Sequence, residues 1–116
     1  MDERIEKAFE VANYMATLSN QRRIVLEEYN QKLVHYINGA TFRITPELIN
    51  LTKTVLDLDQ TTDVAFVDSN NFPIIVADVQ EFFDNIIAIY FEATNEYAAK
   101  YANLKSKRKI ADIVEL

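Results

Sequence analysis

The sequence predicts an α+β fold, with two long antiparallel helices packed on a small antiparallel sheet with one short helix. Apolar residues recur at steps of three and four over residues 2–37 and again over residues 78–108. Short apolar runs bounded by turn residues lie between these segments, and the 116-residue chain has a single glycine, Gly39. We therefore expect the order helix, strand, helix, strand, strand, helix in one domain over residues 1–116.

Residues 2–37 are predicted to form one long helix. Its seam contains, in chain order, Ile5, Ala8, Ala12, Met15, Ser19, Arg22, Leu26, Tyr29, Leu33 and Tyr36. The polar Ser19 and Arg22 interrupt this seam, so a break into two helices at the sequence SNQRR is the alternative. A neighbouring stripe that includes Val11, Leu18 and Val25 can carry the burial through the gap.

Gly39 follows Asn38 and has two interpretations. Asn-Gly is a strong signal for a two-residue hairpin, which would pair residues 33–37 with residues 40–44. Asn-Gly also ends helices, because glycine enters the left-handed conformation without a steric penalty. Since the helical period continues to Tyr36, we favour the helix cap and place the first strand at residues 40–44. Whether residues 33–37 are helix or strand stays open at this point.

The middle of the chain contains a short helix and a strand pair. Thr45 is a suitable N-cap and Pro46 suits the first helical position, which predicts a helix over residues 46–58. Residues 63–77 read as two strands around the turn sequence Asp-Ser-Asn-Asn. Both faces of the first of these strands are apolar, so we expect a covering layer on each side, either the short helix or a second copy.

The last element is predicted to be a helix that begins after Asp78 and runs to about residue 108. Asp78 and Glu81 have the spacing of a capping box. The seam then contains Val79, Phe83, Ile86, Tyr90, Ala93, Tyr97, Lys100 and Leu104, widened by Phe82, Ile89 and Tyr101. Residues 109–116 are interpreted as a flexible or docking tail.

Composition excludes several function classes. The formal charge of −6 and the pI near 4.7 argue against general attraction to nucleic acid or anionic lipid. The chain contains no cysteine, which rules out disulfides, thiolate catalysis and cysteine–zinc sites. The start MDERIEKAFEV lacks the apolar core of a signal peptide, and the longest apolar run, IIAIYF, is far too short to span a membrane. A cytoplasmic protein without membrane contact is expected.

The sequence contains no convincing catalytic or metal-binding motif. Five oxygen-bearing residues have EF-hand-like spacing, namely Asp57, Asp59, Thr61, Asp63 and Asp68. The sixth position lacks the required glycine and the twelfth lacks the usual glutamate, so a solvated acidic connector is favoured over a calcium site. His35 is the only histidine, and no nucleophile or acid stands near it in sequence. We expect no enzyme activity and no cofactor, and keep a small metal-binding protein or enzyme as the least favoured alternative.

A basic cluster lies near the end of the last predicted helix. It consists of Lys100, Lys105, Lys107, Arg108 and Lys109. Such a cluster could contact a phosphate backbone or an acidic partner. Cations at a helix C-terminus are also favourable without any partner, and this interpretation is preferred. A nucleic-acid-associated accessory factor is therefore the alternative function.

Aromatic residues on the two long helices suggest self-association. Tyrosine combines a large apolar body with a polar tip and is enriched at interfaces. The predicted dimer seam consists of Tyr29, Tyr36, Phe83, Tyr90, Tyr97 and Tyr101. The same residues could instead fill the groove between the two helices of one chain. Because a helix of about 50 Å overhangs a small sheet, we expect a homodimer, or another protein partner, at the remaining apolar seam. A hairpin at Asn38 and Gly39 would shorten the helix and remove that surplus, and the case for a homodimer at this seam would go with it.

Three phrases of the sequence, NGATFRITPELINL, DVQEFFDNI and YFEATNEYAAKY, carry a family resemblance. Over residues 1 to about 108 the chain resembles a family of small proteins encoded by T4-like marine bacteriophages, in particular those that infect cyanobacteria. The resemblance implies a viral protein that acts in the bacterial host cytoplasm or is assembled into a particle. It brings no activity and no functional residues, so the expected function remains a non-enzymatic interaction or structural protein.

Overall fold

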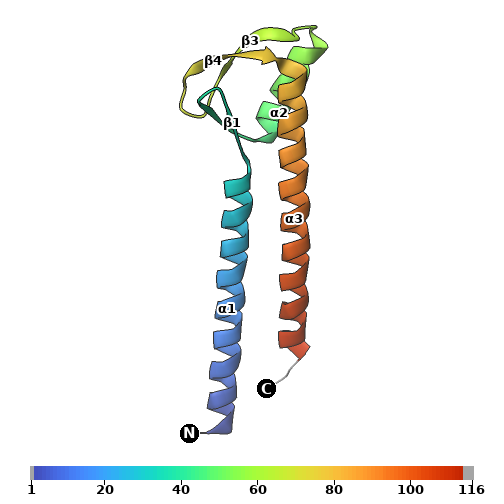
Figure 1. Ribbon diagram of the computed structural model, residues 1–116. Helices are drawn as coiled ribbons and strands as arrows, with labels where there is room; N and C mark the ends of the chain where they lie inside the picture. Colours follow the sequence, from blue (N-terminus) through green and yellow to red (C-terminus); the bar gives the residue numbers. More distant parts are fainter. Residues whose placement is uncertain (1, 114–116) are drawn as a thin grey trace. The chain divides into compact units, whose positions relative to one another are not determined.

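The computed structural model describes the backbone of residues 2–113 and the side chains of residues 2–106. Its elements follow the chain in the order α1 (Glu3–Lys32), β1 (Val34–Ile37), β2 (Ala40–Arg43), α2 (Pro46–Asp57), β3 (Thr62–Val67), β4 (Pro73–Asp78) and α3 (Val79–Ile113) (Figure 1). The predicted α+β class, with long helices and little sheet, is confirmed. The strands form two separate antiparallel pairs, β1 with β2 and β3 with β4.

The chain divides into two compact units. Unit 1 contains residues 1–29 and 95–116, and unit 2 contains residues 30–94. Unit 1 is therefore a pair of helical segments, one from α1 and one from α3. Unit 2 contains both strand pairs, α2 and the first part of α3.

The expectation that residues 33–37 continue the first helix is wrong. α1 ends at Lys32, and His35 pairs with Phe42 in a hairpin between β1 and β2. Asn38 and Gly39 both have positive φ, 49° and 79°, as a type I′ turn requires. The Asn-Gly pair thus makes the tight turn that was the less favoured interpretation. One strand is consequently added to the predicted order of elements.

α1 is continuous through the polar stretch of residues 19–23, so the alternative of two separate helices is not realised. The stripe that packs inward is the neighbouring one, with Leu18 buried and Val11, Met15 and Val25 partly buried. Leu26, a member of the predicted seam, is exposed. Ser19 is exposed, and the guanidinium of Arg22 contacts the ring of Tyr101 on α3, so neither residue leaves an unfilled apolar position in the buried stripe.

The local signals around α2 act as predicted. The Thr45 side chain accepts a hydrogen bond from the backbone N–H of Leu48 at 3.1 Å, and Pro46 occupies the first turn. One turn later, the buried Thr52 donates its hydroxyl to the carbonyl of Leu48 at 2.7 Å. This bond satisfies a polar group that would otherwise be costly to bury.

Phe82 lies at the centre of the core of unit 2. Its ring centroid is 5.1 Å from that of Phe42, 5.3 Å from that of Phe66 and 5.8 Å from that of His35. These rings come from β1, β2, β3 and α3, so one aromatic cluster joins both strand pairs to the helix. The sequence had placed Phe82 only at the margin of the seam.

α3 begins as predicted and continues further than predicted. The Asp78 carboxylate accepts a hydrogen bond from the N–H of Glu81 at 3.1 Å, which caps the first turn. The helix then runs to Ile113 rather than to about residue 108. Part of the expected tail, residues 109–113, is therefore helical, and residues 114–116 lie outside the described residues.

Candidate functional site

An aromatic and cationic row joins the two helical segments of unit 1. The rings of Tyr29 and Tyr97 stack at 4.6 Å with an interplanar angle of 13°, and Tyr97 lies 6.2 Å from Tyr101. The guanidinium carbon of Arg22 is 5.6 Å from the centroid of Tyr101, within the range of a cation–π contact. In these contacts the residue number decreases along α1 as that of its partner increases along α3, so the two segments run antiparallel, as predicted.

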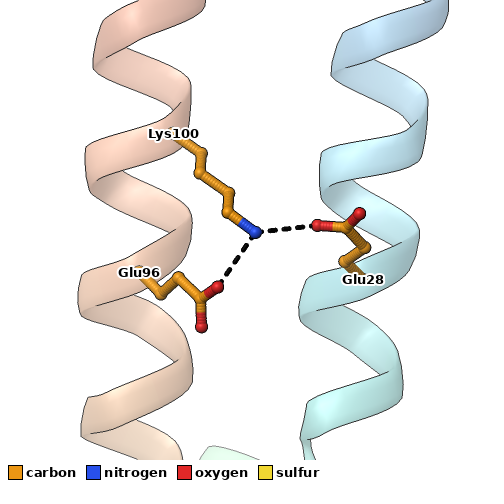
Figure 2. A network of polar contacts seen from close by, with 3 residues as sticks. All are labelled: Glu28, Glu96 and Lys100. Atoms are coloured by element: carbon orange, nitrogen blue, oxygen red, sulfur yellow. Dashed lines mark hydrogen bonds and ion pairs between the residues drawn. The ribbon is translucent and has the colours of Figure 1, made fainter.

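Lys100 ties the same two segments together. Its Nζ donates to Glu28 Oε2 on α1 and to Glu96 Oε1 one turn earlier on α3, both at 2.9 Å (Figure 2). These hydrogen bonds, with that to Glu28 the stronger influence, raise the pKa of Lys100 above its usual value. The amine therefore stays protonated at neutral pH, so Lys100 is suited to pairing with carboxylates and not to acting as a base or nucleophile.

A depression of about 240 Å³ adjoins this network. It is lined by Gln21, Ile24, Val25, Lys100, Asn103 and Leu104. Gln21 Oε1 is buried there and accepts no hydrogen bond from any residue that the structure describes. The volume is below the roughly 300–1,000 Å³ typical of small-molecule sites, so the depression does not by itself define one.

The residues of the predicted dimer seam are divided between the two units. Tyr29, Tyr97 and Tyr101 come together in unit 1, where they contact one another and Arg22. Phe83 and Tyr90 lie in unit 2, half-buried on the first part of α3. Tyr36 is not on a helix at all, because it lies on β1 with 73% of its surface exposed. Its placement in a helical seam was wrong, because the hairpin replaces the last helical turns.

The predicted basic patch is partly committed to other contacts. Lys100 is half-buried and held between two carboxylates, whereas Lys105 is exposed. Lys107, Arg108 and Lys109 lie on the helical backbone of α3, and their side chains lie outside the described residues. The contact of this patch with nucleic acid stays a prediction.

The acidic connector has a structural role that its spacing did not indicate. Residues 62–67 are strand β3, and the buried Asp68 accepts backbone N–H bonds from Thr41, Asn70 and Phe72 at 2.9–3.2 Å. These bonds, led by that from Phe72, lower the pKa of Asp68 below its usual value. Among residues 2–106, whose side chains the structure describes, no group of three or more acidic or histidine side chains could hold a metal ion.

His35 lies beside the core residue Phe82 of unit 2. Its ring is partly buried beside Phe82, and its Nε2 is buried without a hydrogen-bond partner among the described residues. Burial disfavours the charged imidazolium and lowers the pKa of His35 below its usual value. This environment is typical of a residue that packs against the core. The absence of enzyme activity remains a prediction made from the sequence.

Sequence reasoning missed two exposed apolar surfaces. The first is a stripe on α1 formed by Ile5, Phe9, Ala12 and Ala16, all exposed; Ile5 and Ala12 belong to the predicted seam, whereas Phe9 and Ala16 do not. Its alternating four-three spacing is visible in the sequence and could have been found by testing every helical phase. The second is the outward face of the β3–β4 hairpin, whose two-sided apolar pattern was noted but assigned to burial.

Comparison of the chain with protein-family models, with curated proteins and with solved structures finds no match. The resemblance to bacteriophage proteins, the cytoplasmic location and the homodimer therefore stay predictions. Within residues 2–113, no helix combines the length and the apolar character needed to cross a membrane. A functional proposal for this protein therefore depends on its fold and on its exposed surfaces.

Proposed function

We propose that this protein is a non-enzymatic interaction protein that forms a homodimer through the amino-terminal half of α1. The supporting observation is the exposed apolar stripe of Ile5, Phe9, Ala12 and Ala16, in which Ile5 and Phe9 are 48% and 58% exposed. Four-three spacing places these side chains on one face of the helix, opposite the buried Leu18. An apolar heptad stripe that faces solvent is typical of a helix with a helical partner.

This interface differs from the seam predicted from the sequence. Tyr29 and Tyr97 stack on each other within one chain, so they are not available as a free surface. The hairpin at Asn38 and Gly39 also removes apolar length from the end of the first helix. The stripe lies at the other end of α1, which still contains 30 residues.

The antiparallel register leaves the first turns of α1 without a described partner from α3. Lys100 contacts Glu28, and Tyr101 lies against Arg22. Continued at the same rise per residue, this register places Ile113, the last described residue of α3, opposite about residue 12 of α1. Ile5 and Phe9 lie beyond that point.

The stripe is complementary to itself when two copies of α1 run antiparallel. In that arrangement Ile5 faces Ala16 of the second copy, and Phe9 faces Ala12 of the second copy. Each large side chain meets a small one, which lets the layers interdigitate, and the pairing is reciprocal as a two-fold axis requires. Glu6, at the margin, faces the neutral Asn13 of the second copy, so no like charges meet there.

Sedimentation equilibrium over about 5–500 µM tests the proposal, because four layers bury less than a standard interface and imply a weak dimer. We expect concentration-dependent dimers for the wild-type chain and monomers for Phe9→Glu. Thr17→Glu adds the same charge at an exposed position on a different face of α1 and should leave the dimer intact. A wild-type chain that stays monomeric throughout, or equal dimerisation of both variants, would contradict the proposal.

Engineered cysteines test the orientation, because the natural chain contains none. When Ile5→Cys and Ala16→Cys chains are mixed and oxidised, the antiparallel arrangement predicts mostly mixed disulfide dimers. If each variant instead links preferentially to itself, the helices run parallel and the large-on-small pairing is wrong.

A further inference from the structure

The outward face of the β3–β4 hairpin is apolar and exposed. Register pairs place Ala65 opposite Ile75 and Val67 opposite Pro73, and all four residues are exposed. Val67 and Ile75 are 62% and 55% exposed. The intervening residues that point the other way include the buried core residue Phe66. A solvent-facing sheet side is ordinarily polar, so this apolar face indicates a contact surface.

The end of this face is held in place by Asp68. One carboxylate oxygen accepts the N–H groups of Asn70 and Phe72 at 3.0 and 2.9 Å, and the other accepts that of Thr41 at 3.2 Å. Phe72, which follows this turn, is 66% exposed.

Charge identifies the kind of partner. Residues 30–94 contain nine Asp or Glu and three Lys or Arg, so unit 2 has a formal charge of −6, the same as the whole chain. Four of the carboxylates are exposed at the end of the hairpin opposite the Asp68 turn or on the segment leading into it, namely Asp57, Asp59, Asp63 and Asp78. A ligand that covers the apolar face therefore meets a negative field.

We propose that the outward face of β3–β4 binds a basic segment of another protein, in which Lys or Arg side chains flank apolar ones. A second copy of unit 2 is disfavoured on this face, since it would bring two charges of −6 together, and nucleic acid is disfavoured because its phosphates are repelled. The apolar residues supply contact area, while the carboxylates select the sign of the partner and speed its approach. This surface is independent of the stripe on α1.

The probe is a set of three short acetylated and amidated peptides. One alternates Lys with Val, one alternates Glu with Val, and one alternates Lys with Ser. Binding to the full chain is followed by NMR amide shifts and by titration. We expect only the Lys and Val peptide to bind, with shifts at Val67 and Ile75 and with weakening at higher salt.

The double variant Val67→Thr/Ile75→Thr tests the face itself, because threonine keeps the preference for strand while removing apolar surface. We expect about a tenfold loss of affinity for the Lys and Val peptide. Leu51→Thr, an exposed change on α2 in the same unit, is the matched control and should bind as wild type. Near-UV circular dichroism checks that each variant is folded.

The proposal would be overturned by equal binding of the Glu and Val peptide, by unchanged binding of the folded double variant, or by no binding of the Lys and Val peptide even at low salt. Self-association that disappears in the double variant would assign the face to a second copy instead. If the Lys and Ser peptide binds as tightly as the Lys and Val peptide, charge alone explains the binding, and the proposed contribution of the apolar face to affinity is refuted.

Discussion

Replacement of Phe82 by alanine is the sharpest test of how unit 2 is held together. Phe82 is 1% exposed and its ring lies within 5.1–5.8 Å, centroid to centroid, of the rings of Phe42, Phe66 and His35. Loss of the buried ring and the resulting cavity cost about 3–5 kcal/mol in the free energy of unfolding. A chain of this length is stable by about 6–17 kcal/mol, so the variant should lose a large share of its stability.

The assay is urea unfolding followed by far-UV circular dichroism, with two matched controls. Phe82→Leu leaves a smaller cavity and should cost about 1–2 kcal/mol. Phe83→Ala removes the same side chain from the adjacent, half-buried position and should cost clearly less than Phe82→Ala. If Phe83→Ala is the more damaging of the two, α3 packs with a different phase and the aromatic cluster described here is wrong.

Three further predictions test local features. Gly39→Ala should destabilise the chain by about 1–2 kcal/mol in thermal unfolding, because φ is +79° although a Cβ meets nothing within 4 Å; an unchanged melting temperature would contradict the turn geometry. The pKa of His35 is lowered, so the stability that its neutral ring contributes is present above about pH 6.5 and is lost as the pH falls through the lowered pKa. His35→Leu should therefore abolish the decline in the free energy of unfolding between about pH 7.5 and 5.5. A decline that persists in this variant would come from another group. The pKa of Asp68 is also lowered, so the stability that its carboxylate contributes is present above about pH 3.8 and is lost as the pH falls through the lowered pKa. The difference in melting temperature between wild type and Asp68→Asn should shrink from pH 7 to pH 3, and a difference that stays constant would show that the carboxylate charge is unimportant.

Elements defined by neighbouring residues could be predicted well from the sequence. The Thr45 cap with Pro46 sets the start of α2, and the Asp78 carboxylate caps α3, as both short motifs indicated. The turn between β3 and β4 also lies where its Asp-Ser-Asn-Asn sequence placed it. In each case the stabilising contact joins residues only a few positions apart, so the information is local.

Residues 33–37 show where such local information fails. Leu33 and Tyr36 continue a helical period, yet pairing with β2 puts His35 opposite Phe42 beside the buried Phe82. The helix would satisfy the same backbone groups but would forgo this aromatic packing. Tertiary contact therefore overrides the helical period and agrees with the local Asn-Gly signal, which the period had outweighed.

The role of Asp68 could not be predicted for a related reason. Its carboxylate accepts the N–H of Thr41, 27 residues earlier, and the hydroxyl of Ser69 accepts that of Arg43 at 2.7 Å. These bonds join β2 to the turn between β3 and β4, and they require the two strand pairs to be adjacent already. A carboxylate that looked like the last ligand of a calcium loop is instead a connector between hairpins.

The two proposed surfaces follow from how the chain distributes its polar and apolar groups. Unit 1 contains nine acidic and nine basic residues, so it has no net charge, and contacts within it use Tyr29, Tyr97, Tyr101 and Lys100. Its remaining apolar stripe can therefore meet an identical copy without bringing together two units of like net charge. Unit 2 carries the whole net charge of −6, so the carboxylates around its exposed apolar face would repel a second copy of the same unit. A neutral stripe suited to self-association and an acidic face suited to a basic partner can therefore act in one chain without competing for the same ligand.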